Sequence, residues 1–262
     1  MPDPLPGAPT DRPRQEPTPT VLTTMALVLV RPLGPVNLGM IARLASNLGI
    51  SQLRLVAPHV AADDDQALRF ATSWGRDLLE SAQSFTSLAE ATADLGLVLG
   101  TSGEFHAQAL GAPLEPRSVP QLLEQRAVAR WGLVFGGEAH GLTAAELGAC
   151  HGWLHLETFG ANRSYNLAQA VAILSYLLAR LGALPAPSAW RPPAATAGRL
   201  ELIEARLHAL LLLADHPPAQ DARFRKRLAR LLRTLSISGA DADGLLGMIG
   251  SLERALTRRD AP

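Results

Sequence analysis

The stretch FGGEAHGL, residues 135–142, directly follows the apolar run WGLV at residues 131–134. A short apolar run of this kind is typical of a buried strand. A strand that ends on two glycines and an acidic residue suits a ligand site, because ligands of open parallel sheets bind beyond the carboxyl ends of strands and glycines let main-chain groups come close to them. A glycine pair after a strand is more often only a turn, so the stretch by itself leaves both interpretations open.

Similar apolar runs recur along the chain, at residues 25–30, 53–56, 95–100, 131–136 and 153–157. Most of them are continuous rather than alternating, as expected for strands that are covered on both faces. Helical periodicity lies between them, most clearly at residues 38–48, where Gly49 is placed to end the helix, and at residues 166–181. The alternation of strands and helices predicts an α/β fold with a mostly parallel sheet.

The ends of the chain differ in composition from this α/β region, which we place at residues 21–184. Residues 1–20 contain seven prolines and predict a disordered tail. Residues 185–198 contain four prolines and predict a linker. Residues 199–262 predict a helical extension, in which residues 222–235 combine an apolar face with six basic side chains.

Global composition excludes several classes of protein. Lys+Arg and Asp+Glu are both 24 among 262 residues, so any basic surface for a nucleic acid must be local. Cys150 is the only cysteine, which excludes an intrachain disulfide and a cysteine-rich zinc site and fits a reducing cytoplasm. The scattered histidines indicate no metal site, and the apolar stretch Ala168–Leu181 is too short and polar for a membrane span. We therefore expect a cytoplasmic protein with neither a metal nor a membrane partner.

Two further segments place polar residues at predicted strand ends. VLGTS, residues 98–102, ends on Thr101 and Ser102, and LHLETFGANRSYNLAQ, residues 154–169, leads through a loop into a helix. The standard phosphate and dinucleotide loops are absent, and so is the nucleophile elbow of hydrolases. An adenosine-type ligand held by main-chain groups remains a possible ligand for these strand ends. Asn37 and Ser164 also suit helix N-caps, and Arg43 also suits an ordinary surface position.

Three motifs occur in a diagnostic order: RPLGPVNLGMIARLASNLGI at residues 31–50, LVFGGEAHGL at 133–142 and SYNLAQAVAILSYLL at 164–178. Together they resemble the signature motifs of the SpoU branch of the SPOUT RNA methyltransferases, over about Met25 to Leu181. The C-terminal part, HPP…RFRKRLARLL…LLGMIGSLE, resembles more loosely the TrmJ-type tRNA ribose 2'-O-methyltransferases.

This resemblance implies a parallel sheet with a deep C-terminal trefoil knot, S-adenosylmethionine as cofactor, and a homodimer. It implies 2'-O-methylation of RNA, with nucleotide 32 of the tRNA anticodon loop as the expected target, and no DNA partner. Ribosomal RNA is the alternative substrate. A knotted RNA-binding protein without methyl transfer, and a small-molecule α/β enzyme, are the alternatives from other classes.

The resemblance also assigns roles to individual residues. The expected cofactor-binding residues are Thr101, Ser102, Gly103, Gly136, Leu156, Ser164 and Tyr165. The expected catalytic or RNA-contacting residues are Asn37, Arg43, Glu138, Ser164 and Asn166. A guanidinium stays protonated, so we expect Arg43 to act electrostatically on a phosphate or a developing alkoxide, with Glu138 orienting it or accepting the proton through water. Gly137 and Tyr165 depart from the family pattern, which usually has Arg and Leu there.

Overall fold

The computed structural model describes residues 21–104, 110–181, 193–235 and 237–259. The predicted disordered tail and most of the predicted linker lie outside these residues. The α/β region contains six parallel strands in one sheet with the order β3-β2-β1-β5-β4-β6. Their bounds are Met25–Val30 for β1, Gln52–Val56 for β2, Gln83–Phe85 for β3, Leu97–Ser102 for β4, Trp131–Gly136 for β5 and Gly152–His155 for β6.

Helices cover both faces of this sheet, which confirms the predicted α/β fold with a parallel sheet. Side chains alternate along β1, so that Leu27 and Leu29 enter one core layer while Val28 and Val30 enter the other. The first layer holds the 3-10 helix η1 (Val21–Thr24), α1 (Pro35–Asn47), α2 (Asp65–Glu80), α5 (Val119–Gln125) and α7 (Leu167–Leu181), and the 3-10 helix η2 (Pro116–Ser118) lies against α7 without adding a buried side chain. The second layer holds α3 (Leu88–Thr92) and α6 (Ala144–Ala149).

The two helices predicted at residues 38–48 and 166–181 are present as α1 and α7, but α7 does not bury all of its apolar side chains. Gly49 has a φ of 74° just after α1 and lets the chain turn, as its position predicts. On α7, Val171, Leu174 and Leu178 are buried, but Leu177 is 41% exposed. The apolar repeat of α7 is therefore wider than the face that the sheet covers, because one side of the helix faces away from the core.

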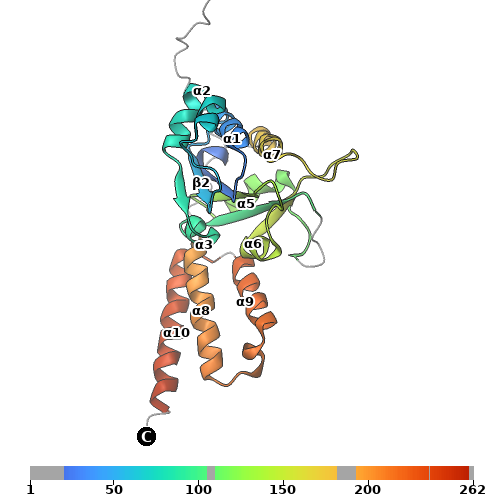
Figure 1. Ribbon diagram of the computed structural model, residues 1–262. Coiled ribbons are helices and arrows are strands. Elements are labelled where there is room, and N and C mark those ends of the chain that lie inside the picture. The colour runs from blue at the N-terminus through green and yellow to red at the C-terminus, as the bar shows by residue number, and fades with distance from the viewer. Residues whose placement is uncertain (1–20, 105–109, 182–192, 236, 260–262) are drawn as a thin grey trace, which may run out of the picture.

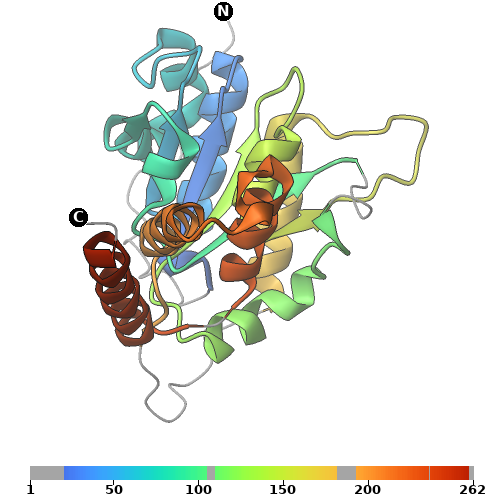
Figure 2. The same ribbon diagram turned by 90° about the horizontal axis from the view of Figure 1, so that it is seen from below.

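The C-terminal part forms a helical unit below the sheet, as Figures 1 and 2 show. Its elements are α8 (Ala197–Leu213), the 3-10 helix η3 (Pro217–Gln220), α9 (Ala222–Thr234) and α10 (Gly239–Arg259), which share a core of their own. The start of α8 joins the sheet domain through main-chain hydrogen bonds from Ala197 to Leu95 (2.9 Å) and from Gly198 to Ala93 (3.1 Å). Each core therefore belongs mainly to one part of the chain.

A second contact between the sheet domain and the helical C-terminal unit lies near His151. Its Nδ1 accepts a hydrogen bond from the main-chain N–H of Val98 at 3.1 Å, and its Nε2 is enclosed without a hydrogen-bond partner among the described residues. Arg126 connects the two parts by donating hydrogen bonds to the main-chain oxygens of Arg233 (3.4 Å) and Thr234 (3.2 Å) in α9. Burial lowers the pKa of His151 to about 3, helped by the positive charges of Arg126 and Arg233.

We expect stability to fall as the pH drops below about 6.5, because the unfolded chain protonates His151 there while the folded chain resists protonation down to about pH 3. Each pH unit within this window costs up to about 1.4 kcal/mol. His151→Asn keeps an acceptor for Val98 and removes the titration, so its urea midpoint should change less between pH 7.5 and 5. His59→Asn, at an exposed histidine, is the control. Equal pH dependence in the wild type and His151→Asn would contradict the expectation.

Candidate active site

A cavity of about 600 Å³ opens at the carboxyl ends of β4, β5 and β6. All seven residues predicted to bind a cofactor line it, together with Glu138 and Asn166. They come from three segments that lie apart in the sequence: the end of β4, the loop after β5 and the loop between β6 and α7. The segments meet because the three strands are parallel neighbours and end at the same edge of the sheet.

The adjacent glycines of the FGGEAHGL stretch, Gly136 and Gly137, are required by close main-chain contacts. A Cβ at Gly136 would lie 1.9 Å from the main-chain carbon of Gly141 and 2.2 Å from the nitrogen of Leu142. A Cβ at Gly137 would lie 2.2 Å from the main-chain oxygen of Arg31. The loop after β5 therefore folds back tightly on itself and against the end of β1, and this arrangement leaves no room for an arginine at residue 137.

Glu138 projects from this loop toward the start of α1. Its carboxylate accepts hydrogen bonds from the main-chain N–H groups of Leu33 at 2.9 Å and Gly34 at 3.0 Å, and from Asn37 Nδ2 at 2.8 Å. Gly34 is the N-cap of α1 and offers no side-chain cap of its own. Glu138 therefore supplies from another loop the negative charge and acceptors that a helix N-terminus favours.

Asn166 extends this network to the third segment. Its Oδ1 accepts a hydrogen bond from Ala168 N at 2.9 Å and so caps α7, while its Nδ2 donates to Asn37 Oδ1 at 3.1 Å. Asn37 thus bonds to Glu138 with one end of its amide and to Asn166 with the other. The result is a polar row, Glu138–Asn37–Asn166, beside the cavity.

The electrostatics of Glu138 favour an anchoring role over proton transfer. Partial burial tends to raise its pKa, but the hydrogen bonds from Asn37 and from the N–H groups of Leu33 and Gly34 outweigh burial and lower the pKa below its ordinary value of 4.5. A carboxylate that is held ionised in this way is a weak proton acceptor near neutral pH. Its oxygens bind α1 and Asn37, and no hydrogen bond joins it to Arg43 among the described residues.

Arg43 and Ser164 are the two predicted catalytic residues outside this row. Arg43 is exposed on α1, six residues after Asn37, which is roughly 9 Å along a helix axis. Its main-chain nitrogen packs on α2, where a Cβ at Gly75 would lie 2.8 Å from it. Ser164 is exposed in the loop before α7 and lines the cavity, and a Cβ at Gly103 would lie 3.4 Å from its Cβ.

The cavity has further lining residues that the sequence analysis did not name. Leu142 and Leu167 contribute apolar walls, while His140 and Arg163 are polar and exposed. His140, Leu142 and Leu167 lie within the quoted motifs, and Arg163 lies directly before the third, so extending each motif to its neighbours would have found them. Among the described residues, no group of three His, Cys, Asp or Glu side chains is placed to hold a metal ion.

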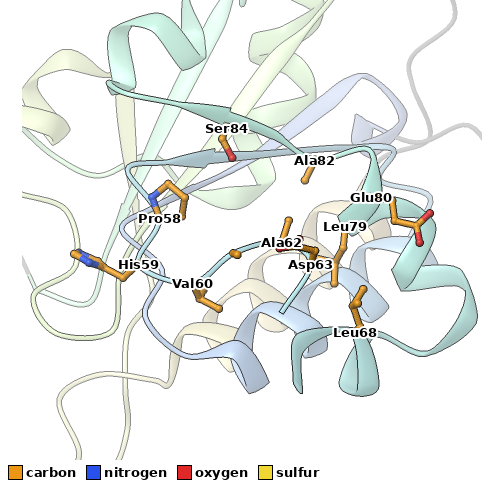
Figure 3. Close-up of a pocket in the computed structure, with 11 residues that line it drawn as sticks. Pro58, His59, Val60, Ala62, Asp63, Leu68, Leu79, Glu80, Ala82 and Ser84 are labelled. Atoms are coloured by element: carbon orange, nitrogen blue, oxygen red, sulfur yellow. The ribbon is translucent and has the colours of Figure 1, made fainter. Parts of the chain in front are cut away.

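A second cavity of about 580 Å³ lies at the β2–β3 edge of the sheet (Figure 3). It is lined mainly by aliphatic side chains, and its charged groups, Asp63 and Glu80, are acidic. It contains none of the motif residues and has no arginine or lysine for an anionic ligand. We therefore place the candidate active site at the first cavity.

The first cavity suits an adenosine-type ligand. Its volume falls within the range of about 300–1,000 Å³ that is usual for small-ligand sites. Leu142, Leu156 and Leu167 offer an apolar surface, and Gly103 and Gly136 expose main-chain groups beside it. Thr101 directs its hydroxyl to Val134 O (2.9 Å), so it fixes β4 to β5 and offers the ligand main-chain atoms.

Comparison with known proteins gives a consistent result. The SpoU rRNA Methylase family profile matches residues 24–176. The tRNA (cytidine/uridine/adenosine-2'-O-)-methyltransferase TrmJ of Pseudomonas aeruginosa is 32% identical over 249 residues, covering 89% of this chain and 95% of that protein. The tRNA (cytidine/uridine-2'-O-)-methyltransferase TrmJ of Pectobacterium atrosepticum is 32% identical over 241 residues, covering 89% and 98%.

The crystal structure of TrmJ from Z. mobilis ZM4 has the same fold, with a TM-score of 0.73 and 27% sequence identity over 87% of this chain and 98% of that chain. The agreement extends beyond the sheet domain, because the residues before the helical C-terminal part are too few to make up 87% of the chain. The motifs, the family profile and the fold lead to one conclusion: the chain belongs to the SpoU methylase family.

Proposed function

We propose that this enzyme transfers the methyl group of S-adenosylmethionine to a ribose 2'-hydroxyl of tRNA. Membership of the SpoU methylase family and the named activities of its relatives support this activity. The observation that carries the proposal is the Glu138–Asn37–Asn166 row beside a cavity that suits an adenosine-type ligand. Amide groups on a fixed row can orient a ribose hydroxyl without chemistry of their own.

S-Adenosylmethionine would lie against the main chain of Gly103, Gly136 and Leu156, with Tyr165 at its side. When bound, it supplies a methyl group already activated by the sulfonium. The chain then has to align the hydroxyl with that methyl group and to exclude competing orientations, while the hydroxyl proton passes to solvent water and the thioether of the spent cofactor is the leaving group. Asn37, Ser164 and Asn166 hold the ribose, and Arg43 neutralises the adjoining phosphate as a permanent cation.

The finer features of the family extend this proposal. Cytidine or uridine at position 32 of the anticodon loop is the proposed target, reached in the cytoplasm, and the named activities of the relatives toward cytidine and uridine support the choice of base. We also propose that the segment from β6 into α7 passes through a loop to form a trefoil knot. The resemblance of the fold to TrmJ from Z. mobilis ZM4 supports that topology.

We propose that two copies of the chain pair through α7. Tyr176, Leu177 and Leu181 are 57%, 41% and 44% exposed on this helix, so they leave an apolar stripe that the sheet does not cover. Covering such a stripe is favourable in proportion to the apolar area removed from water. Light scattering at micromolar concentration tests the pairing, and a monomeric mass would reject it.

The basic face of α9 is the proposed support for the tRNA backbone. Arg225 and Arg233 pair with Glu204 and Glu201, whereas Arg227 and Arg230 are exposed and have no ion pair among the described residues. We expect Arg227→Glu with Arg230→Glu to weaken tRNA binding and to lower the log–log salt slope by about 1.4–1.8. Fluorescence titrations at several salt concentrations measure the slope, with Arg254→Glu on α10 as the control. An unchanged slope would place the RNA surface elsewhere.

Transfer of tritiated methyl groups to bulk tRNA and to ribosomal RNA tests the proposed activity directly. We expect incorporation into tRNA, with the label on a 2'-O-methylnucleoside after digestion. Incorporation only into ribosomal RNA would correct the substrate. Cofactor binding without transfer to either RNA would instead favour a binding protein that has lost the activity.

A further inference from the structure

Two aromatic side chains of α2 are more exposed than their size and type would suggest. Phe70 is 42% exposed and Trp74 is 51% exposed, whereas Trp131 and Trp153 are 0% and 3% exposed. Large aromatic side chains usually contribute to cores or to binding surfaces. Neither Phe70 nor Trp74 belongs to the active-site cavity, so the proposed function does not yet account for them.

The backbone between them has an unusual conformation. Thr72 has φ 59° and ψ −174° within α2, a combination that costs a β-branched residue free energy. Arg76 Nε donates to Leu68 O at 3.0 Å, at the carbonyl that would accept from residue 72 in a regular helix. The irregular turn is therefore supported by its own side-chain bond and sets the positions of Phe70 and Trp74 on either side of it.

Phe70 and Gly75, the residue after Trp74, adjoin α1 at the point where α1 and α2 cross closely. A Cβ at Gly39 would lie 2.8 Å from Phe70 Cβ, so Phe70 sits directly on α1 beside Met40, which is 47% exposed. Gly75, the residue after Trp74, packs on the main chain of Arg43. We call the exposed group Met40, Arg43, Phe70 and Trp74 the α1–α2 surface.

Two exposed arginines accompany these aromatic side chains, on helices that also carry the exposed acidic residues Asp65, Asp77 and Glu80. Arg43 and Arg69 are both exposed, and no hydrogen bond or ion pair of either guanidinium occurs within the described ranges. Arg43 is also the residue proposed to neutralise the phosphate of the methylated nucleotide, so this surface continues from the reaction centre. Exposed aromatic rings interleaved with free arginines are the combination by which proteins stack unpaired bases and hold their phosphates.

We propose that Phe70 and Trp74 form a stacking platform for an unpaired base next to the methylated nucleotide, with Arg69 holding its backbone. This inference rests on the proposed function, because it takes RNA as the substrate. It adds a part of the chain, α2, that the cofactor cavity and the polar row do not include. It also assigns Phe70 and Trp74 to substrate selection, since a base already paired in a duplex cannot stack on a protein side chain.

Full-length variants at Trp74 separate stacking from simple apolar contact. Trp74→Leu keeps an apolar side chain without a π face, and Trp74→Phe keeps the face. We expect Trp74→Leu to weaken binding of an RNA stem-loop by about 5-fold to 150-fold, and Trp74→Phe to stay within about 3-fold of the wild type. The salt slope should be unchanged in Trp74→Leu but lower by about 0.7–0.9 in Arg69→Gln, because Arg69, unlike Trp74, contacts a phosphate.

Tryptophan emission provides a direct readout. Binding of the stem-loop should quench wild-type emission, and the quench should be smaller in Trp74→Phe and with a fully paired duplex of the same composition. Leu252→Ala, at a leucine that is 54% exposed on α10, is the control and should behave as the wild type. Thermal melts and S-adenosylmethionine affinity should match the wild type in every variant, because the substituted side chains lie on the surface outside the cavity.

The outcomes distinguish this inference from the proposed function. If Trp74→Leu weakens stem-loop binding while no RNA is methylated by the wild type, the platform stands and the enzymatic proposal fails. If the wild type methylates tRNA but Trp74→Leu and Phe70→Leu bind the stem-loop as tightly as it does, the platform is rejected. If Trp74→Leu instead turns a dimer into a monomer by light scattering, the surface binds a second copy of the chain and the platform is rejected as well.

Discussion

Glu138→Ala is expected to lower the rate of methyl transfer about 100-fold or more while leaving the fold intact. The substitution removes the acceptor of three hydrogen bonds and leaves the N–H groups of Leu33 and Gly34 without their partner. Asn37 then loses one of its two fixed contacts, and the ribose is held less accurately. Misplacement of a reacting group by about 1 Å can cost about 100-fold in rate. Single-turnover transfer to tRNA at saturating cofactor measures the effect.

The pH profile distinguishes an anchoring carboxylate from a general base. Because the pKa of Glu138 is lowered below 4.5, the side chain stays ionised throughout the range from pH 6 to pH 9. The ratio of wild-type to Glu138→Gln rates should therefore be constant across that range. A wild-type inflection that disappears in Glu138→Gln would show that this residue takes the proton and would reject the anchoring role.

Gly136→Ala is expected to reduce S-adenosylmethionine affinity by about 10-fold to 100-fold and to lower the melting temperature. The added methyl carbon would lie 1.9 Å from a main-chain atom of Gly141, and a main-chain contact cannot be relieved by rotating a side chain. Overpacking of this kind typically costs about 1–3 kcal/mol. The loop after β5 must move, and it forms one wall of the cavity.

Gly160→Ala is the matched control, because a Cβ at Gly160 meets nothing within 4 Å. Calorimetry with S-adenosylmethionine and thermal melting of both variants give the comparison. Equal cofactor affinity in Gly136→Ala and the wild type would mean that the loop after β5 does not form the cofactor site, whatever the stability of the variant.

The sheet could be predicted from sequence to the extent that its strands are buried. The runs at residues 25–30, 53–56, 95–100, 131–136 and 153–157 correspond to β1, β2, β4, β5 and β6, with shifts of one or two residues at some ends. β3 was missed because its sequence, QSF, lies at the edge of the sheet and carries no apolar pattern. The irregular turn at Thr72 has no sequence signal either, since threonine is not a residue that favours a positive φ.

The candidate site likewise has residues that could be predicted from the sequence and contacts that could not. Residues at strand ends were found because the strands are parallel, which places all their carboxyl ends at one edge. The contact between Asn37 and Asn166 could not be found, because 129 residues separate them and the contact depends on how α1 and α7 are oriented. The partners of Glu138 include two main-chain N–H groups, which carry no identity in a sequence.

The strand order has a consequence for how this chain is made. β1 pairs on one side with β2, which is nearby in the sequence, and on the other side with β5. Met25 can pair with Trp131 only after 106 further residues have been synthesised. At a synthesis rate of about 5–20 residues per second, that edge of β1 stays unpaired for roughly 5–20 s on the ribosome. An open apolar strand edge invites pairing with other nascent chains. Slower elongation between residues 31 and 131 should therefore lower the yield of soluble protein, whereas slower elongation after residue 136 should not.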